Sequence, residues 1–140
     1  SPDDVTVDSR RLREAARGMN ALIVDDEPIV HDILSETLEA AGFGVERSDN
    51  AVAALKRLEE NDYNLIISDI KMPGLDGKEF YREVKKIRPE ALKRIIFISG
   101  DSVSPETREF LKETGNASLK KPFNINTLNA AVLKLISGKP

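Results

Sequence analysis

The stretch IISDIKMPG, residues 66–74, places one carboxylate, that of Asp69, directly after a run of apolar residues. The apolar run is as long as a typical strand, and Pro73 and Gly74 behind it are turn residues. We therefore expect a buried strand that ends at the acid. A carboxylate that leaves the core at a strand end is a candidate functional group.

Four further apolar runs flank this stretch, and longer segments with helical periodicity separate them. The alternation is typical of βαβ units and predicts an α/β fold with a parallel sheet. The expected strands are residues 21–24, 43–47, 64–68, 94–99 and 117–120. We expect one doubly wound (βα)5 domain of the flavodoxin-like type.

The composition of the strands indicates their order in the sheet. A strand covered on both faces is continuously apolar, whereas a half-covered strand alternates. The second and fifth strands alternate, so we place them at the edges, in the order 2-1-3-4-5. Right-handed crossovers then put the first and fifth helices on one face and the other three on the opposite face. Ligands of such sheets bind at the carboxyl ends of the strands, where the strand order reverses.

Each expected helix carries apolar residues at a spacing that places them on one face. Ser104 and Pro105 have the residue types of an N-cap and a first helical position. His31 lies among the apolar positions of the first helix, and we expect an ordinary surface position for it. The stripes expected to face the sheet are Val30, Ile33, Leu34, Leu38 and Ala41; Ala51, Ala54, Leu55 and Leu58; Phe80, Val84 and Ile87; Phe110 and Leu111; and Leu128, Val132, Leu135 and Ile136.

Polar side chains follow four of the strands. Three carboxylates that meet at one sheet edge repel one another unless a cation neutralises them. Because the chain has no cysteine and one histidine, an oxygen-only site for Mg²⁺ is favoured over a zinc site. The polar residues are Asp25 and Asp26 after the first strand, Asp69 after the third, Ser99 at the fourth, and Lys120 or Lys121 at the fifth.

A carboxylate beside Mg²⁺, a hydroxyl and an ammonium group can together attack a phosphoryl group, with Asp69 as the nucleophile. Each residue also has an ordinary interpretation. Asp25 and Asp26 could cap the next helix, Ser99 is a common strand-end residue, and a lone lysine is usually solvated. Four strand ends with complementary chemistry favour the functional interpretation.

The composition excludes several classes of protein. A net charge of −3 argues against binding to nucleic acid or to an anionic membrane. No apolar run approaches the length of a membrane span, and no disulfide can form. We expect a cytoplasmic domain whose partners are proteins or small ions.

Four segments, LIVDDEP, IISDIKMPGLDG, FISG and LKKPF, resemble in this order the acidic pair, the phosphorylation-site strand and loop, the hydroxyl strand and the Lys-Pro strand of response-regulator (CheY-like) receiver domains. The resemblance covers residues 20 to about 137. It implies that Asp69 accepts a phosphoryl group from a histidine kinase or a histidine phosphotransfer domain. Such a domain is a phosphoacceptor that catalyses its own phosphorylation and dephosphorylation, and not a conventional enzyme.

The same resemblance assigns roles to the other site residues. It implies that Mg²⁺ binds to Asp26, to Asp25 partly through water, to Asp69 and to the backbone carbonyl of Lys71. Lys121 would contact Asp69 and the phosphoryl oxygens, next to a peptide bond with Pro122 that is usually cis in the family. The switch hydroxyl would be that of Ser99.

Phosphorylation would switch a surface made by the helix that begins near Ser104, the strand 117–120 and the last helix. The phosphoryl group adds about −1.5 to −2 charges beside Mg²⁺ and gives Ser99 an acceptor. Most family members have an aromatic residue or histidine three positions before the lysine, where this chain has Ser118. The oligomeric state is not predicted.

We expect three segments: residues 1–19 as a linker or tail from an upstream region, residues 20–137 as the receiver domain, and residues 138–140 as a C-terminal tail. Leu12, Ala15, Ala16 and Met19 have helical spacing, so the first segment is either a linker helix or a disordered tail. The favoured parent is a hybrid histidine kinase with this receiver at its C-terminal end. A free-standing regulator is the alternative.

Three other functions compete with this interpretation. An aspartyl-phosphate phosphatase of the haloacid-dehalogenase type has a second aspartate two residues after the nucleophile as acid and base, where this chain has Lys71. A pseudo-receiver that binds partners without phosphorylation predicts the loss of an acidic residue or of the lysine, and none is lost. A nucleotide-binding fold would have a glycine-rich loop where this chain has DDEP.

Overall fold

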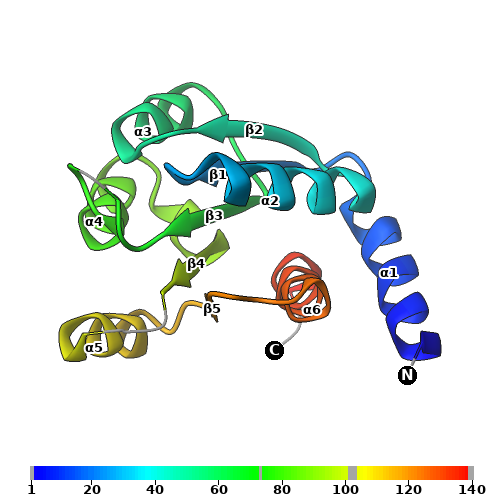
Figure 1. The fold of residues 1–140 in the computed structure, drawn as a ribbon. Helices are drawn as coiled ribbons and strands as arrows, with labels where there is room; N and C mark the ends of the chain where they lie inside the picture. The colour runs from blue at the N-terminus through cyan, green and yellow to red at the C-terminus, as the bar shows by residue number, and fades with distance from the viewer. Residues whose placement is uncertain (1, 73, 101–103, 139–140) are drawn as a thin grey trace.

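The computed structural model describes residues 2–72, 74–100 and 104–138 of the 140-residue chain. Five parallel strands form one sheet in the order β2-β1-β3-β4-β5, which confirms the predicted topology (Figure 1). Each strand lies within one residue of its expected bounds. The strands are β1 (Asn20–Val24), β2 (Gly44–Ser48), β3 (Leu65–Asp69), β4 (Ile95–Ser99) and β5 (Ser118–Lys120).

Side-chain caps begin four of the helices. Asn50, Asp76, Ser104 and Asn124 each accept a hydrogen bond from the backbone N–H three residues on, which satisfies a group that has no partner within the helix. The cap predicted at Ser104 is confirmed. The helices are α1 (Pro2–Ala16), α2 (Pro28–Ala41), α3 (Ala51–Glu60), α4 (Gly77–Ile87), the 3₁₀ helix η1 (Pro89–Arg94), α5 (Pro105–Thr114) and α6 (Ile125–Ser137).

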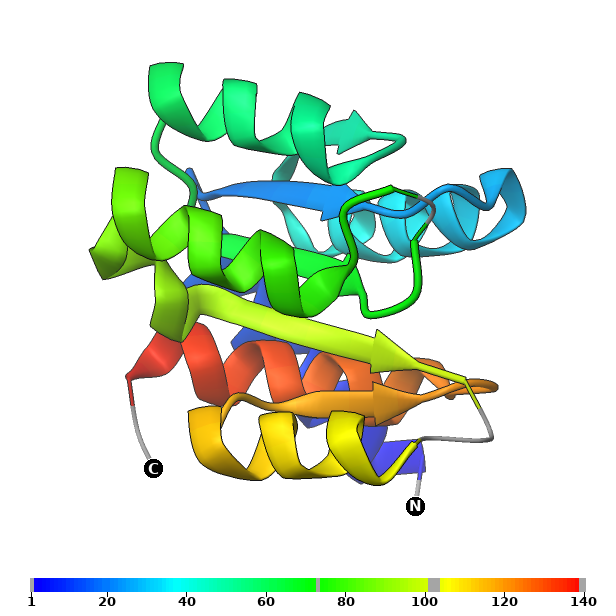
Figure 2. The same ribbon diagram turned by 90° about the vertical axis from the view of Figure 1, so that its left-hand side faces the viewer.

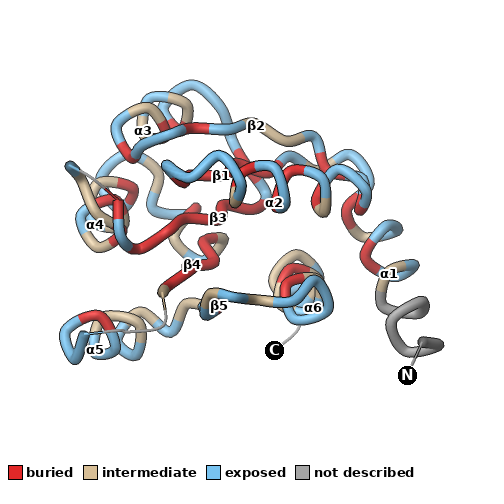
Figure 3. Tube along the Cα trace, viewed as in Figure 1, coloured by how far each residue is buried: buried red, intermediate tan, exposed pale blue. Residues whose placement is uncertain are grey.

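The helices cover the sheet in two layers. Alternate residues of one strand serve opposite layers: Ala21 and Ile23 of β1 lie in the core with α2 and α6, whereas Leu22 and Val24 lie in the core with α3 and α4. Figure 2 shows α3, α4 and α5 in front of the sheet and α2 and α6 behind it. This is the predicted division of helices. In Figure 3 the buried residues concentrate along β1, β3 and β4.

The buried face of α2 differs from the predicted stripe. Ile33 is 43% exposed, whereas His31 is 3% exposed, so the surface position expected for His31 is wrong. The buried polar side chains of α2 each have one hydrogen-bond contact, and His31 Nδ1 has no hydrogen-bond partner among the described residues. His31 Nε2 contacts the carbonyl oxygen of Asp25, and Arg47 Nε donates to Ser35 Oγ at 2.8 Å. The buried residues of α2 are His31, Leu34, Ser35, Leu38 and Ala41.

Parts of the other stripes are also buried less than predicted. Ile87 is 39% exposed because α4 ends there and the chain turns away at Arg88. Phe110 and Leu111 are half-buried at the margin of the core. The ring of Phe110 contacts those of Tyr81 and Phe97 edge-on, with centroids 5.5 Å apart in both pairs.

Helix α1 belongs to the same layer as α2 and α6. Its residues Leu12 and Ala16 are 1% and 0% exposed and lie in the core between the sheet and those helices. The first segment is therefore helical. The domain limits at residues 19/20 and 137/138 stay a prediction, and residues 139–140 of the expected tail lie outside the described residues. None of the helices in the described ranges combines the length and apolar character that crossing a membrane requires.

Candidate functional site

The sheet brings two carboxylates together where its strand order reverses. Asp69 is the last residue of β3, and Asp25 directly follows β1, the strand paired with β3. Asp69 is 4% exposed and Asp25 is 1% exposed. Two buried carboxylates on neighbouring strand ends require positive charge nearby, because each raises the free energy of ionising the other.

A third carboxylate, that of Glu27, completes the cluster. Oxygen atoms of Asp25, Glu27 and Asp69 lie within 4.8 Å of one another. Asp26 is exposed and is not a member of this group among the residues that the structure describes. Glu27 was not predicted. Pro28 is the sequence signal that could have identified Glu27, because proline is common at the first position of a helix and makes the residue before it the N-cap. At this N-cap, the backbone N–H of Glu27 donates to Asp25 Oδ1 at 2.8 Å.

Lys121 supplies positive charge to all three carboxylates. Its Nζ lies 2.8 Å from Glu27 Oε1, 3.0 Å from Asp69 Oδ2 and 3.8 Å from Asp25 Oδ2. Burial alone would lower the pKa of Lys121, but the hydrogen bonds to Glu27 and Asp69 outweigh burial and raise this pKa. Lys121 therefore stays charged.

One lysine leaves the cluster short of positive charge. Burial and the charge of Asp69 raise the pKa of Asp25, although the hydrogen bond from the Glu27 amide lowers it. Asp25 Oδ2 is buried without a hydrogen-bond partner among the described residues. A buried, unpartnered carboxylate oxygen beside two other carboxylates fits a hard divalent cation, which prefers oxygen ligands.

Backbone hydrogen bonds hold the site in place. The N–H of Lys71 donates to Asp69 Oδ1 at 3.1 Å, and the N–H of Gly77 donates to the carbonyl oxygen of Ile70 at 2.8 Å. Ser99 ends β4 and is 7% exposed, and its carbonyl oxygen accepts from the N–H of Lys121 at 2.7 Å. The Lys121–Pro122 peptide bond is cis, as the resemblance implies.

The comparisons with known proteins identify the family. The model of the response regulator receiver domain matches residues 21–133. The chain belongs to this family. The receiver is 33% identical to the transcriptional regulatory protein FixJ of Bradyrhizobium diazoefficiens over 110 residues. These aligned residues are 79% of this chain and 53% of FixJ. The chain thus spans about half of that relative.

Other relatives match over nearly their whole length. The response regulator receiver protein CpdR of Brucella abortus is 30% identical over 115 residues, which is 82% of this chain and 94% of CpdR. A crystal structure of a CheY-like receiver domain protein from Methanospirillum hungatei superimposes with a TM-score of 0.77 at 30% identity, covering 86% of this chain and 94% of that one. A receiver domain of two-component signalling is therefore established for this chain.

Proposed function

We propose that Asp69 accepts a phosphoryl group, with the help of Mg²⁺, from a phosphohistidine of a histidine kinase or histidine phosphotransfer domain. One observation carries the proposal. A buried carboxylate has one oxygen 3.0 Å from the Nζ of Lys121 and lies beside a second buried carboxylate with an unpartnered oxygen. This arrangement combines a nucleophile, a fixed cation and a place for a metal ion, as phosphoryl transfer requires.

Different groups of the chain orient the nucleophile and stabilise the transferred phosphoryl group. The Lys71 N–H and Lys121 Nζ each hold one oxygen of Asp69, which orients the carboxylate. An Asp69 oxygen forms the new bond to phosphorus as the phosphorus–nitrogen bond of the donor breaks, and the histidine nitrogen keeps the electron pair. Lys121 then stabilises the charge of the phosphoryl oxygens.

Mg²⁺ would supply further charge neutralisation at the phosphoryl oxygens. Its proposed ligands are Asp25, Asp26, Asp69 and the backbone carbonyl of Lys71. Glu27 joins the candidates because its carboxylate belongs to the observed cluster. The donor set contains oxygen alone, which suits Mg²⁺.

The output of the switch is part of the proposal. Ser99 would move toward the phosphoryl group and change the surface formed by α5, β5 and α6. Ser118 is exposed on β5, so any such change proceeds without an aromatic side chain at that position. The cytoplasmic location and the hybrid-kinase parent stay predictions, and the proposal includes no contact with nucleic acid or membrane.

Intact-mass spectrometry after incubation with acetyl phosphate tests the function. We expect the wild type to gain one phosphoryl group only when Mg²⁺ is present, and Asp69→Asn to gain none. Asp49→Asn is a matched control, because the Asp49 side chain is 91% exposed, and this variant should react like the wild type.

The opposite result has a defined meaning. A wild-type chain that gains no phosphoryl group and does not bind beryllofluoride would support the pseudo-receiver. Continuous release of phosphate from unrelated phosphomonoesters would support the phosphatase, which Lys71 argues against because it supplies no carboxylic acid.

A further inference from the structure

Helix α1 docks on the domain through an apolar contact. Among its side chains that the structure describes, residues 9–16, only Leu12 and Ala16 are buried. These two residues pack into the core beside α6 and α2. Because only residues 17–19 connect α1 to β1, the helix stays near this face even when it is not docked. Elements at a chain terminus can open locally while the rest of a domain stays folded, so α1 can undock without unfolding the sheet.

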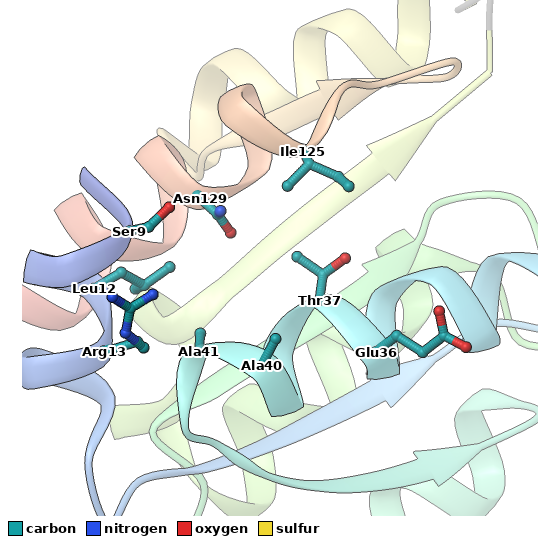
Figure 4. A pocket seen from close by; sticks show the side chains of 9 residues that line it. All are labelled: Ser9, Leu12, Arg13, Glu36, Thr37, Ala40, Ala41, Ile125 and Asn129. Atoms are coloured by element: carbon teal, nitrogen blue, oxygen red, sulfur yellow. The ribbon is translucent and has the colours of Figure 1, made fainter. Parts of the chain in front are cut away.

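A groove beside Leu12 shows that the contact is incompletely packed. It has a volume of about 320 Å³ and lies between α1, α2 and α6 (Figure 4). Arg13 and Ser9 of α1, Thr37 of α2 and Ile125 of α6 line it. Protein cores are close-packed, and an open groove deprives its walls of dispersion contacts. The groove therefore leaves room beside Leu12 for α1 to change its position.

The two helices that hold α1 both begin within four residues of a side chain of the acidic site. Glu27 is the N-cap of α2, and α6 starts at Ile125, four residues after Lys121. Lys121 Nζ lies 2.8 Å from Glu27 Oε1, so one ion pair joins the start of α2 to the loop before α6. The same Nζ lies 3.0 Å from Asp69 Oδ2. One lysine thus connects the phosphoacceptor to the helix pair on which α1 rests.

We propose that docking of α1 is coupled to the state of Asp69 through the Lys121–Glu27 ion pair. Phosphorylation draws Lys121 toward the phosphoryl oxygens and away from Glu27, which frees the start of α2 from the loop before α6 and weakens the docking of α1. By linkage, docked α1 disfavours phosphorylation to the same extent. The phosphoryl step rests on the proposed function, whereas the link from the ion pair to α1 does not.

Hydrogen exchange of the whole chain, read at the amides of residues 9–16, tests the coupling. We expect exchange of these amides to accelerate at least about fivefold when Mg²⁺ and beryllofluoride are added, and also in Glu27→Gln without any ligand. Reciprocally, Leu12→Ala should bind beryllofluoride more tightly by a similar factor. Arg11→Ala is the control, because Arg11 is exposed on the same helix, and its affinity should match that of the wild type.

Each outcome decides one part of the argument. Unchanged or slower exchange of α1 in Glu27→Gln overturns the coupling, whatever beryllofluoride does. If beryllofluoride leaves the amides of residues 69–71 unchanged in the wild type, the proposed function fails, and Glu27→Gln alone decides whether the ion pair controls α1. If beryllofluoride binds but α1 does not respond, the coupling is overturned and the function stands.

Discussion

Gly77→Ala should destabilise the domain by pushing on the phosphoacceptor loop. A Cβ at position 77 would lie 2.8 Å from the Cα of Ile70 and 3.2 Å from the carbonyl oxygens of Asp69 and Ile70. These are backbone atoms, so the strand end must shift. Overpacking of this kind lowers the free energy of unfolding by about 1–3 kcal/mol. The better helix propensity of alanine at the start of α4 offsets up to about 1 kcal/mol of this loss. We expect a net loss of about 1–2 kcal/mol.

Urea unfolding at equilibrium measures this loss as a lower midpoint with an unchanged slope. Gly100→Ala is the matched control near the same site, because a Cβ there meets no heavy atom of the described residues within 4 Å. Gly77→Ala should also react more slowly with acetyl phosphate, since the displaced backbone carries Asp69. Equal urea midpoints for the two variants would refute the steric argument.

Two further predictions concern pH. Because burial raises the pKa of Asp25 above its usual 3.8, its ionisation lowers stability as the pH rises from acid. Without divalent cations, we expect Asp25→Asn to be more stable than the wild type at pH 7 and to lose this advantage near pH 3. In thermal unfolding, Mg²⁺ should stabilise Asp25→Asn less than the wild type. Burial and the hydrogen bond to Glu46 raise the pKa of Tyr63 from 10 to about 12. The folded state therefore keeps this proton longer, so stability should fall between pH 10 and 12 by up to about 2–3 kcal/mol, and a urea series with Tyr63→Phe should show a smaller fall. If the free energy of unfolding fell equally with pH in Tyr63→Phe and in the wild type over that interval, the raised pKa of Tyr63 would not be its cause.

The sheet could be predicted from the sequence because its strands differ in how they are covered. Continuous apolar runs marked the inner strands and alternating ones marked the edges, and the order followed from handedness. The meeting of Asp25 and Asp69 followed from the same argument, since neighbouring strands of a parallel sheet end together. Topology alone thus located most of the candidate site.

The missed features depend on side-chain reach and on partners distant in sequence. Glu27 joins the carboxylates because the turn before Pro28 directs its side chain toward Lys121, which periodicity does not encode. His31 is buried because the carbonyl oxygen of Asp25 lies within reach, whereas an apolar stripe assumes that polar side chains face water. The docking of α1 depends on a complementary face of α6, which its own pattern of Leu12 and Ala16 could not reveal.

The two edges of the sheet are poor templates for another strand. Strand β5 has three residues and exposes Lys120, and β2 carries Glu46 and the exposed Arg47. Short, charged edges resist strand addition between molecules, which protects a protein from aggregation through its sheet. A partner that binds the surface of α5, β5 and α6 would therefore contact side chains and not the open backbone of β5.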